Sequence, residues 1–191
     1  MSKRRAKRVA TLMVGLITLG LAYAQQHNII KPAVKVAEQN QPGLFKVTEF
    51  VDGDTIAVDM NGTKEKVRFI GVDTPETHDP RKAVQCFGQA AADFTKKTIG
   101  SNRVRLEADP QNTNRDRYNR LLRYVYLPDG TLVNAEIIKQ GYGFAYTFFP
   151  FSKLDEFRSY EKTARENNKG LWGNCAPTAD SKGQIHSNDI N

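Results

Sequence analysis

Asn61-Gly62 is the feature that most limits what this chain can fold into. An Asn-Gly pair between two strand-like runs is a strong signal for a two-residue β-hairpin turn. The run before it, residues 44–60, consists of two strand-like pieces hinged at Asp52-Gly53-Asp54. The run after it, residues 64–72, is also strand-like, with apolar residues on both faces. Three adjacent antiparallel strands are therefore predicted.

Two more strands and three helices are predicted further along the chain. Residues 103–109 and 120–127 alternate as strands do. Residues 84–100, 131–141 and 152–170 have a helical pattern and each run stops at a glycine. Five strands with helices between and after them predict an α+β domain, mainly β, with three packed helices on a five-stranded closed barrel. The OB fold is the commonest barrel of that size.

The first 24 residues have the three parts of a secretory signal peptide. A basic start is followed by an apolar run and by Ala22-Tyr23-Ala24, a small-x-small cleavage site. The apolar run from Val9 to Ala24 has 16 residues, fewer than the roughly 20 that cross a bilayer as a helix. We therefore expect export to the medium or the cell envelope, with cleavage after Ala24. Membrane anchoring by residues 9–24 is the alternative.

The formal charge of +7 gives little information about a partner. Five basic residues and no acid lie in the signal segment, which leaves +2 for the rest of the chain. Residues 96–123 hold eight Lys or Arg and three acids, so a polyanion could bind there, although a solvated face accounts for most of these charges. With 39% hydrophobic residues, the chain has the composition of one globular domain.

Polar segments flank the predicted domain. Residues 25–43 include Pro32 and Pro42 and have no clean period, which is typical of a linker. Residues 176–191 have the same character and are predicted to be a disordered tail. The folded domain is accordingly expected over residues 44–175.

Cys86 and Cys175 are the only two cysteines. They are far apart in sequence, with no second Cys or His at metal-ligand spacing, and an exported protein enters an oxidising compartment. These facts favour a disulfide between them. Two unrelated buried thiols are the alternative.

Arg68 lies inside the apolar run 67–72. Because apolar residues fall on both faces of this predicted strand, Arg68 cannot lie on a face that is fully exposed to solvent. A guanidinium there needs an anionic partner, and an internal ion pair with a carboxylate would meet that need. The hairpin brings the ends of its two strands together, which gathers Asp54, Asp73 and Thr74. Two carboxylates with a threonine hydroxyl or carbonyl are hard oxygen ligands of the kind that Ca²⁺ takes. For Asp54 alone, a turn-making role is the simpler interpretation.

Four motifs together resemble the staphylococcal (micrococcal) nuclease family, in order and with matching gap lengths. They span roughly residues 44–172 and read VDGDTIAV, VRFIGVDTPET, RDRYNRLLRYVY and LVNAEIIKQGYGFAYTFF. The resemblance implies a Ca²⁺-dependent endonuclease on an OB-fold barrel with three helices, cutting DNA and RNA to leave 3′-phosphates. We expect a monomer without a stable protein partner.

The resemblance also implies a role for individual residues. Asp54, Asp73 and Thr74 would bind calcium. Arg68, Glu76 and Arg120 would be catalytic, with the two arginines on the phosphate and Glu76 as general base for water. Substrate contacts would come from the remaining family positions, which are Arg81, Lys82, Tyr118 and Tyr146.

The chain departs from the best-known member of the family at three points. Asn119 occupies a glycine position, Phe148 occupies a tyrosine position, and the two cysteines have no counterpart there. The lost tyrosine hydroxyl puts one nucleotide contact in question.

Two other interpretations remain: a catalytically silent nuclease-like domain that binds nucleic acid or protein, and an OB-fold binding module without nuclease ancestry. The intact acids and arginines argue against the first. The second predicts stacking aromatics on the strands in place of these acids and arginines. Tyr118, Tyr124 and Tyr126 could serve that purpose, but Tyr124 and Tyr126 alternate with Val125 as in any half-buried strand.

Overall fold

The Asn61-Gly62 turn joins β2 (Thr55–Met60) to β3 (Thr63–Phe69) in the computed structural model, as predicted. Both turn residues have positive φ, 55° and 87°, as a type I′ hairpin turn requires. β1 (Leu44–Phe50) pairs with the other side of β2, so the three strands are antiparallel neighbours. The structure describes residues 43–77, 84–181 and 183–189.

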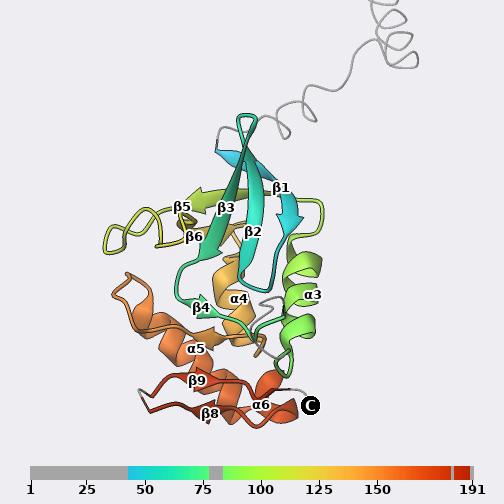
Figure 1. Cartoon of the computed structure of the whole chain (residues 1–191), viewed down its shortest axis with the longest axis vertical. Coiled ribbons are helices and arrows are strands. Elements are labelled where there is room, and N and C mark those ends of the chain that lie inside the picture. The colour runs from blue at the N-terminus through green and yellow to red at the C-terminus, as the bar shows by residue number, and fades with distance from the viewer. Residues whose placement is uncertain (1–42, 78–83, 182, 190–191) are drawn as a thin grey trace, which may run out of the picture. The chain divides into compact units, whose positions relative to one another are not determined.

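β5 (Arg103–Glu107) and β6 (Leu121–Tyr126) complete a closed barrel with the order β1-β2-β3-β6-β5 (Figure 1). β6 runs parallel to β3, whereas β5 is antiparallel to β6 and to β1. The predicted five-stranded OB-type barrel is confirmed. Its register sets Arg68 on β3 opposite Thr55 on β2 and Leu122 on β6.

The three predicted helices are confirmed as α3 (Gly88–Ile99), α4 (Val133–Lys139) and α5 (Leu154–Glu166), although α5 ends before the predicted stop at Gly170. α3 ends at Gly100, which has φ 57° and donates its N–H to Lys96 O, so the predicted terminal glycine is also confirmed. α4 packs against α3 and α5 and contributes Ile137 to the core that it shares with the barrel. Other members of that core are fully buried strand residues, among them Ile56, Val67, Phe69 and Val125.

The predicted strand 64–72 divides in two. After β3 the chain passes through Gly71, whose φ is 71°, and β4 (Val72–Asp73) then pairs with β7 (Phe144–Ala145) in a separate two-stranded sheet. A Cβ at position 71 would lie 2.7 Å from the Phe151 ring, so both the backbone conformation and the packing call for glycine. The bend turns the chain out of the barrel just before Asp73.

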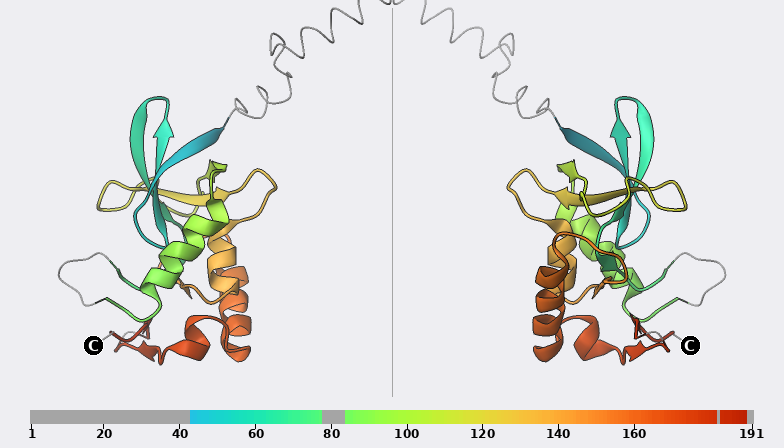
Figure 2. Two further views of the ribbon diagram at one scale, coloured as in Figure 1. Left: turned by 90° about the vertical axis from the view of Figure 1, so that its right-hand side faces the viewer. Right: turned by 90° about the vertical axis from the view of Figure 1, so that its left-hand side faces the viewer.

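The segment after Cys175 differs from the predicted disordered tail. It follows α6 (Leu171–Asn174) and forms a hairpin of β8 (Thr178–Ala179) and β9 (Ile185–His186). Its polar composition predicts no core, but a disulfide and backbone hydrogen bonds from a distant part of the chain order it. Figure 2 shows these strands beside the segment that leads into α3.

The predicted signal peptide, residues 1–24, and nearly all of the predicted linker lie outside the described residues. Within the described ranges, no helix is both long enough and apolar enough to cross a bilayer.

Candidate active site

Arg68 lies at the end of β3 between two carboxylates. Its Nη2 is 2.8 Å from Asp73 Oδ1, and its Nη1 pairs with Asp54 Oδ2. The Arg68 side chain is 16% exposed and that of Asp54 only 6%. The predicted need for an anionic partner is therefore met by two of the acids that the sequence gathers at this strand end.

Asp54 organises the residues around it. Its Oδ2 accepts hydrogen bonds from the Thr74 N–H at 2.9 Å and from Thr74 Oγ1 at 3.1 Å, and its Oδ1 accepts one from Thr55 Oγ1 at 3.0 Å. Gly53 allows this approach, because a Cβ there would lie 2.8 Å from the Thr74 side chain. Asp54, Asp73 and Thr74 are thus brought together as predicted.

Arg120 reaches the same cluster from the start of β6. Its Nε donates to Asp116 Oδ2 at 2.7 Å, and its Nη1 donates to Thr55 Oγ1 at 3.5 Å. Burial opposes ionisation of Asp116, but hydrogen bonds from Arg120 outweigh it and lower the pKa of this carboxyl. Thr55 therefore links Arg120 to Asp54, and Asp116 orients the guanidinium.

Asn119 precedes Arg120, at the position where the best-known member of the family has glycine. Its φ is 64°, in the left-handed region that Asn tolerates better than most residues. The turn still forms, with the Asn119 N–H donating to Asp116 O at 3.0 Å. The departure at this position therefore leaves the placement of Arg120 intact.

Glu76 is positioned through its backbone. Its N–H donates to Gln85 Oε1 at 2.9 Å, and its carbonyl accepts from the Gln85 N–H at 3.0 Å. Glu76 Oε1 accepts from the Thr77 N–H at 2.9 Å. The loop that carries the predicted general base is thus held by the segment leading into α3.

Asp52, which the sequence predicts only as part of a turn, lies beside this cluster. Its Oδ1 accepts from the Asp54 N–H at 3.1 Å. Burial raises the pKa of the Asp52 carboxyl above its ordinary 3.8, and the nearby charge of Glu76 adds to this rise. Arg68 and Arg120 oppose it. A second aspartate two positions before Asp54 was the available signal.

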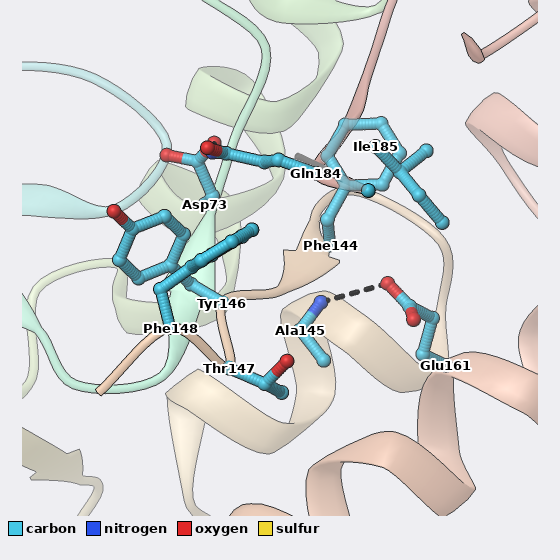
Figure 3. A pocket seen from close by; sticks show the side chains of 10 residues that line it. Asp73, Phe144, Ala145, Tyr146, Thr147, Phe148, Glu161, Gln184 and Ile185 are labelled. Carbon is cyan, nitrogen blue, oxygen red and sulfur yellow. Dashed lines mark hydrogen bonds between the residues drawn. The ribbon is translucent and has the colours of Figure 1, made fainter. Parts of the chain in front are cut away.

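The structure describes two of the predicted substrate-binding residues, Tyr118 and Tyr146. Tyr118 is 61% exposed, accepts a hydrogen bond from Arg117 Nη2 at 2.7 Å, and lies with its ring centroid 5.4 Å from Arg120 Cζ. Tyr146 lies near Asp73 (Figure 3), and burial, with the charge of Asp73, raises the pKa of its hydroxyl.

Phe148 packs against Tyr146 with ring centroids 5.5 Å apart and is 46% exposed. An aromatic surface therefore persists at the position where the tyrosine hydroxyl is missing. Arg81 and Lys82 lie outside the described residues.

The donor set fits a hard cation. Asp54 and Asp73 already share one positive group, the Arg68 guanidinium, and Thr74 adds oxygens beside them. Carboxylate and hydroxyl or carbonyl oxygens, completed by water, are what Ca²⁺ takes. Within the described part of the chain, no three or more His, Cys, Asp or Glu side chains form a group that could hold a metal ion by themselves.

Cys86 and Cys175 form the predicted disulfide, with Cα atoms 6.1 Å apart across a sequence separation of 89 residues. The bond ties the segment before α3 to the end of α6. It therefore lies close in sequence to Gln85, which holds Glu76.

Comparison with known proteins agrees with this arrangement. Residues 66–174 match the family described as staphylococcal nuclease homologue. Thermonuclease of Staphylococcus hyicus is 36% identical over 164 residues, which cover 85% of this chain and 94% of that protein.

Two further relatives are more similar over shorter stretches. Endonuclease YncB of Bacillus subtilis is 41% identical over 138 residues, covering 70% of this chain and 64% of its own length. Thermonuclease of Staphylococcus intermedius is 41% identical over 132 residues, covering 67% of this chain and 75% of its own. The chain therefore belongs to the staphylococcal nuclease family.

Proposed function

We propose that this protein is an exported, calcium-dependent endonuclease that hydrolyses phosphodiester bonds of DNA and RNA and leaves 3′-phosphates. The observation that carries the proposal is the convergence of Asp54, Asp73 and Arg68 at one end of the barrel, with Arg120 joined to them through Thr55. The relatives named thermonuclease and endonuclease support the reaction class.

The two arginines suit a phosphate whose charge grows during reaction. Attack by water places negative charge on the non-bridging oxygens, and a planar guanidinium can donate two hydrogen bonds to such oxygens. Arg68 enters this site from β3, and Arg120 enters it from the residue before β6. Arg68 pairs with two carboxylates, and Arg120 pairs with that of Asp116. Those carboxylates keep both side chains oriented.

Glu76 would accept the proton from the attacking water. The water oxygen bonds to phosphorus and the bond from phosphorus to the 5′-oxygen breaks. The 5′-oxygen takes up a proton from solvent and leaves as a hydroxyl, and the phosphate stays on the 3′-oxygen. Calcium, held by Asp54, Asp73 and Thr74, would supply positive charge that polarises and orients the phosphate. Asp52 would add a further acidic group beside these ligands.

The proposal is tested on the purified exported protein with heat-denatured DNA and with RNA. We expect cleavage in calcium, none in excess chelator, and recovery when calcium is restored. Glu76→Gln protein, prepared in parallel, controls for contaminating nuclease. Undiminished cleavage in chelator contradicts the calcium site. If the wild-type protein cleaves neither substrate in any condition, the silent binding domain is favoured.

Two further measurements test the finer parts of the proposal. Product ends should accept a 5′-label without treatment and be extended by a polymerase only after phosphatase removes the 3′-phosphate. Mass spectrometry of exported protein should give a chain that begins at Gln25. Retention in the membrane with residues 9–24 intact would support anchoring instead.

A further inference from the structure

The C-terminal hairpin is well formed for a segment of polar composition. Its turn is closed by the Asp180 N–H, which donates to Gln184 O at 2.8 Å, and by the Gln184 N–H, which donates to Asp180 Oδ1 at 2.9 Å. Gly183 has φ 80°, as the turn requires. The side chain of Gln184 therefore starts from a defined backbone position.

The hairpin is also tied to a distant part of the chain. Cys175 precedes it and is bonded to Cys86. Beyond β9, the Cys86 N–H donates to Asn188 O at 2.8 Å, and Ser187 Oγ, in a residue only 4% exposed, donates to Cys86 O at 2.7 Å. Both ends of the hairpin are thus attached at Cys86.

This attachment brings the hairpin to the active site. Gln184 Nε2 lies 3.5 Å from Asp73 Oδ2 and donates a long hydrogen bond to it. Figure 3 shows the Gln184 side chain extending toward Asp73 along a pocket whose other wall includes Tyr146 and Phe148. Because Arg68 Nη2 donates to Asp73 Oδ1, the two oxygens of this carboxylate have different partners.

A carboxylate with only one oxygen bonded can rotate about its Cβ–Cγ bond and change which oxygen faces the site. A donor on the second oxygen opposes that rotation. Substitution of a residue that holds a metal-binding or catalytic carboxylate in this way commonly lowers metal affinity or activity 10–100-fold.

We propose that Gln184 is a positioning residue for the nuclease reaction, holding the Asp73 carboxylate from the disulfide-anchored C-terminal hairpin. The assignment rests on the proposed role of Asp73 as a calcium ligand. It gives one side chain of the C-terminal hairpin, Gln184, a part in the site.

The test compares three full-length variants with the parent protein. Gln184→Leu keeps an aliphatic side chain that ends one atom short of the amide nitrogen, and it removes the donor. Gln184→Glu keeps the shape and brings a second carboxylate to Asp73. Thr178→Ala is the matched control, since Thr178 is exposed on β8 and pairs with His186 on the same hairpin. For each protein, kcat, KM, the melting temperature and the affinity for Ca²⁺ alone by calorimetry are measured.

We expect Gln184→Leu to lower kcat about tenfold and to weaken Ca²⁺ binding, with KM and melting temperature close to those of the parent. Gln184→Glu should lower kcat further because of charge repulsion, and Thr178→Ala should match the parent.

Parent-like kcat and Ca²⁺ affinity in well-folded Gln184→Leu would overturn the proposal. Equal losses in Thr178→Ala, together with a lower melting temperature, would also overturn it, since the hairpin would then act only through stability. If the parent protein cleaves without calcium, the calcium site fails, while the comparison of kcat between parent and Gln184→Leu still decides the role of Gln184.

Discussion

Arg68 Nη2 lies 2.8 Å from Asp73 Oδ1, so a strand residue and the acid that follows the bend after it form an ion pair at the end of the barrel. Asp54 completes the arrangement from the bend that precedes β2. The same arginine is proposed to bind the phosphate, and this pair would keep its guanidinium in place before substrate arrives. A purely structural ion pair and a catalytic arginine predict different effects of substitution.

Arg68→Lys separates the two roles. Lysine keeps the charge but loses the planar two-pronged donor, so we expect turnover to fall about 10²–10³-fold, which corresponds to roughly 3–4 kcal/mol of barrier. The melting temperature should change little. Arg105→Lys is the control, because Arg105 pairs with Glu107 on an exposed face of β5. Normal turnover in well-folded Arg68→Lys, or a loss confined to stability, would end the catalytic assignment.

Glu76→Gln tests the general base. The amide cannot accept a proton from water, and base catalysis of this kind contributes about 10²–10⁴-fold to rate. We expect kcat to fall by that order, with Ca²⁺ affinity and KM largely kept, because Glu76 is held by its backbone and is not assigned as a metal ligand. Steady-state kinetics and calcium calorimetry provide the comparison, with exposed Glu107→Gln as control. A loss of calcium binding equal to the loss of rate would reassign Glu76 as a ligand.

Reduction of the Cys86–Cys175 bond should lower the melting temperature. The bond closes a loop of about 90 residues, for which loop entropy predicts roughly 4–5 kcal/mol of stabilisation, less any strain. Exported protein should contain no free thiol by mass spectrometry after alkylation. The Cys86→Ser/Cys175→Ser double variant controls for effects of the reductant and should melt at the same temperature in its presence and absence. Two freely alkylated cysteines in native exported protein would reject the bond.

Glu161 predicts a pH dependence of stability. Burial raises the pKa of its carboxyl above the ordinary 4.5, although the Ala145 N–H and Arg165 partly oppose the rise. As pH increases, the Glu161 carboxyl therefore loses its proton at a lower pH in the unfolded chain than in the folded protein. The contribution of Glu161 is most favourable below about pH 4.5 and is lost as pH increases through the raised pKa.

Glu161→Gln keeps an acceptor oxygen for the Ala145 N–H and removes the buried charge. Its melting temperature should exceed that of the parent at pH 7, and the difference should disappear toward pH 4. Melting curves of both proteins across this range are the measurement. A gap that does not vary with pH, or a less stable variant at pH 7, would show that burial of the Glu161 charge does not govern the effect.

Local sequence determined much of this protein. The Asn61-Gly62 turn and the alternation of the flanking runs predict the first three strands, because turn geometry and side-chain period are set within a few residues. The helix that ends at Gly100 follows from the same kind of short-range signal. The sequence also predicts that Asp54, Asp73 and Thr74 lie close together, because one hairpin joins the strands beside them. The family motifs supplied the remaining roles.

Only the tertiary structure decided which distant groups meet. The parallel pairing of β3 with β6 sets Arg68 beside Leu122, and Arg120 then reaches Thr55 across 65 residues of sequence. Gln184 contacts Asp73 across 111 residues, from a segment whose polar composition predicts no order. Such contacts depend on a closed barrel and on a disulfide between remote cysteines. No local pattern encodes them, since their free energy arises only when the whole domain has folded.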